Sequence, residues 1–341
     1  MTLSLISIGL SDENDLSLRA LSEAKSCDIL YVELYTMRLA TTLVALSELA
    51  GKPVTLLPRG DLEERSNGII DEAKSNRVGI LIGGDCLNAT THIALVLEAK
   101  QKGVKTRVIH GSSIFSAIAE TGLSIYKFGK TITMPFPEKG PPDTVLRVIE
   151  ENLVNGLHTL VLLDLDNEKN TYMAAPYAIQ GLIDAGLSPN TLVVAVARLG
   201  QPDALIKAGK AKDVASLDLG EAPHSLVIPG SLHFLEEDAL KALAGCHSEA
   251  LKGRVVKPEL DGLIEKYTLG CRRVREKMKL KQLPTQITET KVLELLDHVD
   301  HYLTDAEYYK AEKKPTALTS VAYAEGILDA LKLLGVADFE W

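Results

Sequence analysis

Residues 79–92 read GILIGGDCLNATTH, a short apolar run that ends in two glycines and an aspartate before a threonine-rich stretch. The apolar run predicts a buried strand, and open α/β sheets bind ligands in the loops that follow their parallel strands. A plain turn from strand to helix needs one glycine at most, so Gly83 followed by Gly84 indicates that something approaches the backbone closely. The alternative interpretation is a turn in which Asp85 only caps the next helix.

The composition is that of an ordinary globular chain. Of its 341 residues, 46% are hydrophobic and 24% are charged, which is enough to bury a large core. The first residues carry no basic leader segment and no apolar run reaches the ~18 residues of a membrane span, so we expect a cytoplasmic protein with no membrane partner. The net charge of −9 argues against nucleic acid as the main partner, which would require a broadly basic surface.

Short β-branched runs alternate with amphipathic stretches through the first ~240 residues, which predicts an α/β chain with mostly parallel strands. Strands are expected at 4–8, 29–33, 54–57, 78–82 and 107–110. The segment PFPEKGPPD, at 135–143, is too rich in Pro and Gly for a helix or a central strand. It predicts a boundary between an α/β domain at 1–134 and a second one at 135–250, in which short loops favour antiparallel pairing.

The strand pattern disappears after about residue 258, and three helical stripes follow. The first runs from Leu260 to Met278, the second from Val292 through Leu295 to Leu303, and the third from Leu318 to Leu331. Apolar residues at this spacing predict one buried face on each helix. The sequence therefore predicts a separate helical domain at 258–341.

Two charged patterns on these helices have a functional and a structural interpretation. His298 and His301, with Asp297 and Asp300, have the spacing of metal ligands on one helix side, but a solvated acidic face is more common and no metal site is predicted. The basic stretch CRRVREKMKLK, at 271–281, would suit RNA or an acidic protein, and a solvated cationic face is again favoured. The four cysteines of the chain form no C-x-x-C pair, so neither a disulfide framework nor a zinc site is expected.

The glycine loop belongs to an ordered series of motifs. The series reads LISIGLSDENDLSLRAL, GGDCLNATTH, VIHGSSIFSAIAETGLSIYKFGKT, NGLHTLVLLDLD, VVAVARLGQPDALIKAG and APHSLVIPGSLHFLEEDAL. Together these motifs closely resemble the archaeal diphthine synthase family, a branch of the tetrapyrrole-methylase-like methyltransferases, over residues 1 to about 248. The resemblance implies a two-domain α/β fold with mixed sheets, a homodimer, and S-adenosylmethionine bound between the two domains. It also implies methylation of the amino group of 3-amino-3-carboxypropyl-histidine on translation elongation factor 2, a step of diphthamide biosynthesis.

The same resemblance implies which residues contact the methyl donor: Leu10, Asp85, Asn88, Ser113, Ile114, Leu163, Leu199 and His224. Two positions depart from the family pattern. Cys86 replaces the usual Pro after the Asp, and Asn88 replaces an apolar residue, so Asn88 is expected to contact the donor through its backbone. The last part of the chain resembles a small uncharacterised archaeal helical domain, which implies a helical bundle and no function.

The acceptor amine must lose a proton before it attacks, which requires a base or a pocket that lowers its pKa. Asp164 and Asp166, just past the strand LVLLD, are the candidate bases by position, and structural capping is the alternative for both. Two other functions are weighed against the main one. The first is a methylase of corrinoid precursors, and the second is a non-catalytic scaffold that binds the nucleoside.

Overall fold

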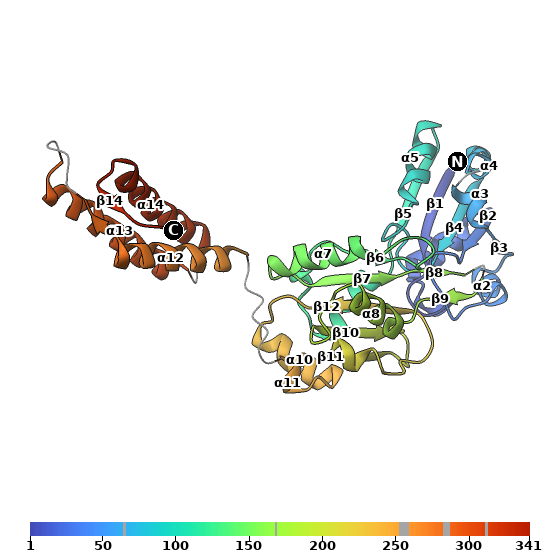
Figure 1. The fold of residues 1–341 in the computed structure, drawn as a ribbon. Helices are drawn as coiled ribbons and strands as arrows, with labels where there is room; N and C mark the ends of the chain where they lie inside the picture. Colours follow the sequence, from blue (N-terminus) through green and yellow to red (C-terminus); the bar gives the residue numbers. More distant parts are fainter. Residues whose placement is uncertain (64–65, 168, 252–258, 282–286, 311–312) are drawn as a thin grey trace. The chain divides into compact units, whose positions relative to one another are not determined.

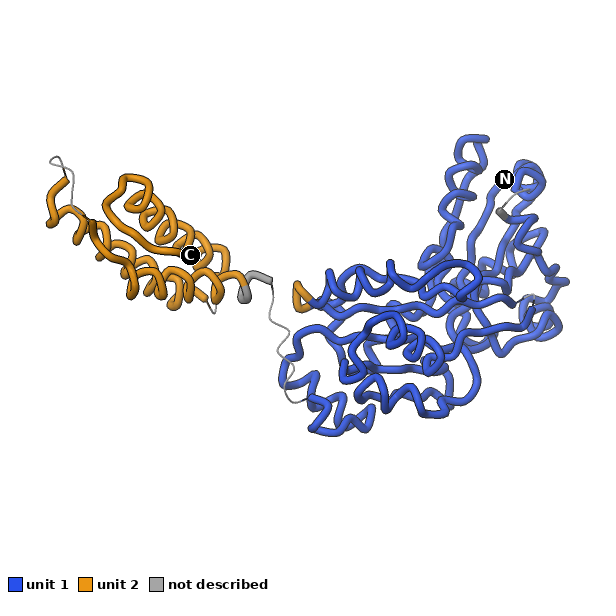
Figure 2. Tube along the Cα trace, viewed as in Figure 1, with its two compact units in different colours: residues 1–153, 157–254 blue, residues 154–156, 255–341 orange. Residues whose placement is uncertain are grey.

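A computed structural model describes residues 1–63, 66–167, 169–251, 259–281, 287–310 and 313–341. The chain divides into two compact units, shown in different colours in Figure 2. The first comprises residues 1–153 and 157–254, and the second comprises residues 154–156 and 255–341. Apart from residues 154–156, both predicted α/β domains lie within the first unit.

The first sheet of unit 1 has five strands in the order β3-β2-β4-β1-β5, and every neighbouring pair is parallel. This confirms the predicted strands and their parallel arrangement. Helices cover both faces: α1 and α2 pack on one face, and α3, α4 and α5 on the other. Figure 1 shows this part of the chain in blue to teal. The elements are β1 (Thr2–Ser7), α1 (Leu18–Ser26), β2 (Ile29–Glu33), α2 (Leu43–Ala50), β3 (Thr55–Leu56), α3 (Arg59–Glu63), α4 (Asn67–Ser75), β4 (Arg77–Ile82), α5 (Ile93–Gln101) and β5 (Lys105–Ile109), with a 3-10 turn at Glu13–Asp15.

The strand that precedes the glycine loop lies at the centre of this sheet. Five of the six residues of β4 are buried, because helices cover both faces and leave no solvent side for an alternating pattern. Gly79 lets the connection after α1 pack closely, since a Cβ there would lie 2.7 Å from Cys27 Sγ. The chain passes from β1 to β2 on one side of β1, and from β4 to β5 on the other. Such a reversal opens a crevice at the carboxyl ends of the strands.

The second sheet has the order β11-β10-β12-β7-β6 and is antiparallel except for the parallel pair of β6 with β7. The expected antiparallel pairing is confirmed. Helices α7 and α8 pack on one face and α10 on the other. The elements are β6 (Ile132–Met134), α7 (Asp143–Val154), β7 (Thr159–Leu163), α8 (Ala175–Asp184), β10 (Leu192–Ala197), β11 (Leu205–Lys210), β12 (His224–Ile228) and α10 (Phe234–Ala244). Shorter elements are α6 (Ile114–Ala117), β8 (Leu165–Asp166), β9 (Thr171–Tyr172), α9 (Ala211–Val214), α11 (Ser248–Leu251) and 3-10 turns at Ile118–Thr121 and Ile125–Lys127.

Two features of the second sheet differ from the sequence expectation. Strand β6 ends at Met134, where the predicted domain boundary falls, yet it pairs with β7 and so belongs to the second sheet. Strand β11 was not predicted, because its sequence LIKAGK shows no alternation of apolar and polar residues, and none of its six residues is fully buried. It forms the edge of the sheet beside β10.

Unit 2 consists of the helices α12 (Glu259–Lys277), α13 (Glu289–Tyr309) and α14 (Lys314–Leu333), with two short paired strands, β13 (Lys279–Leu280) and β14 (Ala337–Asp338). The three predicted stripes supply the core, which confirms the helical prediction. Leu295 is the exception within its stripe, with 40% of its surface exposed. The short strand pair was not predicted, and the expected domain start at residue 258 lies outside the described residues.

The basic stretch at 271–281 forms ion pairs with acidic residues of α13, one of which belongs to the His/Asp cluster at 297–301. Arg272 contacts Glu307 at 2.9 Å and Arg275 contacts Asp300 at 3.1 Å, so part of the basic stretch serves to join α12 to α13. His301 lies 3.6 Å from Asp297 with both side chains exposed. Among the described residues, no group of three or more potential metal ligands lies together, and no helix is long and apolar enough to cross a bilayer.

A buried carboxylate ties the second sheet to the segment before it. Glu236, at the start of α10, is 2% exposed and accepts hydrogen bonds from the backbone of Ser124 at 2.9 Å and of His233 at 2.7 Å. The buried ring of His158 donates to it at 3.0 Å, and Lys127 forms an ion pair with it at 2.5 Å. Burial by itself raises the pKa of Glu236, but these four donors outweigh it and lower the pKa to about 2.

We expect the substitution Glu236→Gln to lower the free energy of unfolding at pH 7 by about 3 kcal/mol, because it leaves buried donors without a charged acceptor. Since the folded pKa of about 2 lies below the ordinary value of 4.5, this stabilisation is complete above pH 4.5 and is lost as the pH falls toward 2. Urea denaturation at several pH values measures the free energy of unfolding of wild type and variant. The difference between the two proteins should decrease as the pH falls from 4.5 toward 2. The control Asp238→Asn removes an exposed pair with Lys241 on the same helix and should cost less than about 1 kcal/mol. Equal costs for the two variants would contradict this account.

Candidate functional site

A cavity of about 580 Å³ opens in unit 1, lined by loops that follow strands of both sheets. Its volume lies in the range of small-molecule sites, and its lining combines leucine and isoleucine side chains with hydroxyl, carboxylate and glycine backbone groups. The eight residues for which the sequence implied donor contact all line this one cavity: Leu10, Asp85, Asn88, Ser113, Ile114, Leu163, Leu199 and His224. Residues separated by more than two hundred positions in the sequence are therefore brought together.

The structure explains why positions 83 and 84 are glycines. Gly84 has φ +67° and forms an antiparallel bridge with Gly9, whose φ is +118°. The Gly84 amide donates to the Gly9 carbonyl at 2.8 Å, which joins the loops after β4 and β1. Gly83 makes room for a side chain, since a Cβ there would lie 2.5 Å from Met37 Cγ. Both glycines line the cavity, but the turn itself already requires Gly84.

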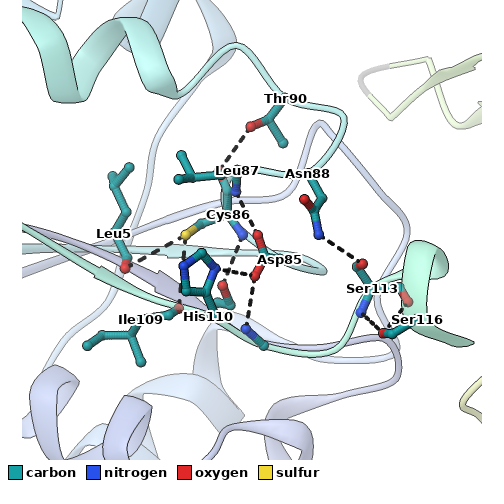
Figure 3. A network of polar contacts seen from close by, with 12 residues as sticks. Leu5, Asp85, Cys86, Leu87, Asn88, Thr90, Ile109, His110, Ser113 and Ser116 are labelled. Carbon is teal, nitrogen blue, oxygen red and sulfur yellow. Dashed lines mark hydrogen bonds and ion pairs between the residues drawn. The ribbon is translucent and has the colours of Figure 1, made fainter. Parts of the chain in front are cut away.

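Asp85 organises the loops around it (Figure 3). One carboxylate oxygen accepts the Leu87 amide at 3.0 Å, and the other accepts His110 Nδ1 at 2.8 Å and the Gly111 amide at 3.2 Å. The side chain is almost completely buried, and burial raises its pKa, but these three donors together lower it below the usual value. The carboxylate is thus ionised and ties the end of β4 to the end of β5.

The two departures from the family pattern take part in this arrangement. The Cys86 amide donates to Ser7 Oγ at 2.9 Å, a bond that a proline in its place could not make. The thiol is buried, and burial raises its pKa, so the cysteine packs as a neutral group. Asn88 Nδ2 donates to Ser113 Oγ at 3.2 Å, so its side chain links two cavity loops, as Figure 3 shows.

Leu10 joins the two halves of the cavity. Its backbone amide and that of Ser11 donate to Asp15 Oδ2 at 2.9 and 2.7 Å, which fixes the loop after β1. Its side chain packs against Gly200 from the second sheet, where a Cβ would lie 2.9 Å from Leu10 Cδ1. Gln201 Nε2 donates to the Leu10 carbonyl at 3.4 Å. A side chain at position 200 would therefore push the two loops apart.

His224, the first residue of β12, is buried with both ring nitrogens engaged. Nδ1 accepts the Ala175 amide at 3.1 Å, so the ring proton is on Nε2, which donates to the Glu221 carbonyl at 2.9 Å. Burial lowers the pKa of this histidine, which keeps it neutral. The residue can meet a ligand through its ring and backbone, but it cannot accept a proton without losing the Ala175 bond.

The two candidate bases are placed differently. Asp164 lines the cavity, but Oδ1 accepts the Leu165 amide at 2.9 Å and Oδ2 accepts the Phe136 amide at 3.2 Å. Lys139 lies 3.0 and 2.8 Å from the same two oxygens. Asp166 pairs with Lys169 at 3.0 Å and is not among the residues that line the cavity. Asp164 therefore anchors the segment PFPEKGPPD, at 135–143, through both of its oxygens, and Asp166 lies outside the cavity lining.

The sequence interpretation missed the segment after β2, where Tyr35, Thr36 and Met37 line the cavity together with Arg59 from α3. Glu33, fully buried at the end of β2, accepts the Tyr35 amide at 3.0 Å and the Thr36 hydroxyl at 2.6 Å. The signal was present, because this segment also follows a parallel strand of the first sheet. Among the loops of the first sheet, those after β1, β4 and β5 contain glycine or polar motifs, and the loop after β2 does not.

Arg198 also lines the cavity, but its guanidinium is committed to the second sheet. Nε donates to Asp203 Oδ2 at 2.6 Å and Nη1 donates to the Leu219 carbonyl at 3.1 Å and to the Glu221 carbonyl. Its own φ of +52° places it in the left-handed region. These contacts make Arg198 a support for the loop before β12.

The segment after β2 is also fixed from the second part of unit 1. Asn167 Nδ2 donates to the Met37 carbonyl at 2.9 Å and to the Leu34 carbonyl. Tyr172 donates to Asn167 Oδ1, which holds the amide in this orientation. A residue more than a hundred positions away in the sequence thus holds the backbone of a segment that lines the cavity.

Comparison with known proteins gives a consistent family. Residues 2–215 match the family Tetrapyrrole (Corrin/Porphyrin) Methylases. The diphthine synthase of Methanocaldococcus jannaschii is 42% identical over 70% of this chain and 97% of the relative, and that of Methanocella arvoryzae is 42% identical over 71% and 98%. A crystal structure of diphthine synthase superimposes with a TM-score of 0.69 at 37% identity, covering 73% of this chain and 98% of that one. Residues 266–337 match a family described as Protein of unknown function (DUF357).

We expect the substitution Asn167→Ala to loosen the segment at 34–37, because it removes both amide donors to that backbone. Hydrogen exchange should show at least tenfold faster exchange of the Tyr35 and Thr36 amides, which donate to Glu33, while the core amides of β4 stay protected. Asn190→Ala, at an exposed loop position, is the matched control and should leave exchange unchanged. Unaltered exchange at 34–37 in Asn167→Ala would show that the bridge does not hold the segment.

Proposed function

Because the chain belongs to the diphthine synthase family of S-adenosylmethionine-dependent methyltransferases, we propose that it methylates the amino group of 3-amino-3-carboxypropyl-histidine on translation elongation factor 2. The observation that carries the proposal is the convergence of eight family-matched residues, from both sheets, on one cavity. The chain covers 97% of the length of a 42% identical relative, so its α/β part corresponds to nearly the whole of that enzyme. The enzyme is accordingly a methyltransferase of diphthamide biosynthesis.

The cavity suits S-adenosylmethionine in size and lining. A nucleoside with an amino-acid arm offers the apolar faces of its ring and its methylene groups together with hydroxyl and charged groups, and the lining offers partners for both kinds. Leu10, Ile114, Leu163 and Leu199 supply apolar contacts, while Asn88 and Ser113 supply polar groups. When bound, this donor supplies a methyl group that is already activated by its positive sulfur.

The chain's own contribution to such a reaction is alignment. Holding the acceptor nitrogen in line with the methyl group and the leaving sulfur can be worth about 7 kcal/mol of the barrier. Rigid loop ends serve this purpose, and here Asp85, Glu33 and Asp15 each fix a cavity loop through buried or partly buried hydrogen bonds. A site built mainly from loop backbones and apolar side chains follows from this requirement.

The remaining assignments rest on family membership. We propose that two copies of the chain form a homodimer, that elongation factor 2 is the protein partner, and that the enzyme acts in the cytoplasm. The segment at 135–143, held by Asp164 through Phe136 and Lys139, is proposed as part of the rim that admits the modified histidine. No function is proposed for the helical domain.

The proposal is tested by incubating the purified protein with isotopically labelled S-adenosylmethionine and elongation factor 2 that carries the unmethylated intermediate. Label on the factor is the expected result. A parallel incubation replaces the factor with a corrinoid precursor. Label on that precursor, and none on the factor, would support the alternative function as a methylase of corrinoid precursors. Binding of the donor by calorimetry without transfer to either acceptor would favour the non-catalytic scaffold.

We expect the substitution Gly84→Val to reduce the affinity for S-adenosylmethionine by at least tenfold, because a branched side chain at φ +67° distorts the bridge to Gly9 at the cavity wall. Gly103→Val is the matched control, since Gly103 has φ +74° but nothing lies within 4 Å of a Cβ there. Both variants should lose about 1–3 kcal/mol of folding stability from backbone strain. Calorimetry that detects equal donor affinity in the two variants would contradict the placement of the donor beside Gly84.

A further inference from the structure

We propose that the hydroxyl of Ser225 binds the carboxylate of the acceptor side chain, within a row of residues that crosses the second sheet. The proposal rests on the proposed function, because that acceptor carries a carboxylate on the same carbon as its amino group. The row consists of directly paired residues on four neighbouring strands: Thr133 on β6, Leu162 on β7, Ser225 on β12 and Val196 on β10. All four line the cavity, and none belongs to the eight positions implied for the donor.

The row lies on one face of the second sheet. Residues paired across neighbouring strands point to the same side of a sheet, and successive residues of one strand point to opposite sides. The side chains of Leu163 and His224, which adjoin the row on their strands, lie on the face covered by α7 and α8. The row therefore occupies the opposite face, where Leu162 and Val196 pack with residues of the segment at 114–128.

The Ser225 hydroxyl is nearly buried and has no hydrogen-bond partner among the described residues. Ser225 is 8% exposed and lies on a central strand whose next residue on the same face, Val227, is apolar. Within the described part of the chain, the one fully buried side-chain oxygen that lacks a partner is that of Thr268, so Ser225 Oγ remains open to the cavity. A hydroxyl in an apolar wall is unfavourable without a partner, so this one indicates a ligand.

The other hydroxyl of the row, on Thr133, lies next to the proposed entrance. Thr133 is exposed, and the rim segment at 135–143 begins two residues after it. Since neighbouring strands lie ~4.8 Å apart, Thr133 and Ser225 are about 10 Å apart, with Leu162 between them. A histidine ring with a three-carbon arm is of comparable length, and its polypeptide must stay outside the cavity. This arrangement sets the ring over Leu162 and the carboxylate against Ser225.

A carboxylate suits this hydroxyl better than a neutral group does. No described residue accepts the Ser225 proton, so the hydroxyl can donate to a ligand, and hydrogen bonds to a charged acceptor are the stronger ones. Because the amino nitrogen and the carboxylate share one carbon, a bond to the carboxylate also restricts the position of the nitrogen. Ser225 thus contributes to the orientation of the nucleophile as well as to affinity for the acceptor.

The test compares Ser225→Ala and Ser225→Thr with wild type, using labelled S-adenosylmethionine and elongation factor 2 that carries the unmethylated intermediate. In Ser225→Ala we expect the KM for the factor, at saturating donor, to rise at least tenfold. The Kd for the donor alone, measured by calorimetry, should change less than twofold. Ser225→Thr keeps a hydroxyl and should stay within threefold of the wild-type KM.

The stability of the free protein separates ligand binding from a structural role. Ser225→Ala removes a hydroxyl that has no partner within the described residues, so the urea midpoint of unfolding should stay the same or rise. Thr121→Val is the comparison, since the buried Thr121 hydroxyl donates to the Ile118 carbonyl at 2.6 Å, and its urea midpoint should fall. An equal fall in the two variants would make the role of Ser225 structural and overturn the proposal.

Ser216→Ala serves as the control for activity, because Ser216 is exposed and does not line the cavity. It should leave the KM for the factor and the Kd for the donor unchanged. A normal KM in Ser225→Ala would overturn the proposal, and so would a donor Kd that rises as much as the KM, which would assign the hydroxyl to the donor. Absence of transfer by wild type would instead overturn the proposed function, so the two failures are distinguishable.

Discussion

The site depends on one ionised carboxylate buried at the edge of the first sheet. Asp85 accepts donors from Leu87, His110 and Gly111, and these belong to the loops after β4 and β5. A buried charge is costly unless it is fully hydrogen-bonded, so the three donors and the carboxylate fix one another's positions. Because the same loops carry Asn88 and Ser113, this interaction fixes the part of the cavity wall that those two residues form.

The glycine bridge complements it from the neighbouring strand. Gly9 and Gly84 exchange backbone hydrogen bonds, which sets the loop after β1 against the loop after β4. Both residues have positive φ angles, +118° and +67°, that residues with side chains rarely adopt. Leu10 then lies against Gly200 of the second half. Contacts at Gly9, Gly84 and Gly200, which have no side chain, thus position both halves of the α/β unit. This explains why the sequence around the cavity is rich in glycine.

Periodicity predicted the architecture well, because a parallel sheet covered on both faces produces continuous apolar runs such as 78–82, and the loops at their carboxyl ends are then known to share one edge. Strand β11 was not predicted, because this edge strand has no continuous apolar run. Site residues were found where a family motif or a glycine marked the loop. The segment at 35–37 had neither mark, and the partners of Asp164 lie in a separate loop, which no local pattern reveals.

What the cavity can do chemically follows from which groups are already occupied. Asp85, Asp164 and His224 each use their acceptor atoms to hold the protein together, so they contribute position and field rather than a lone pair for a proton. Transfer from an activated donor needs little more than alignment and a neutral amine.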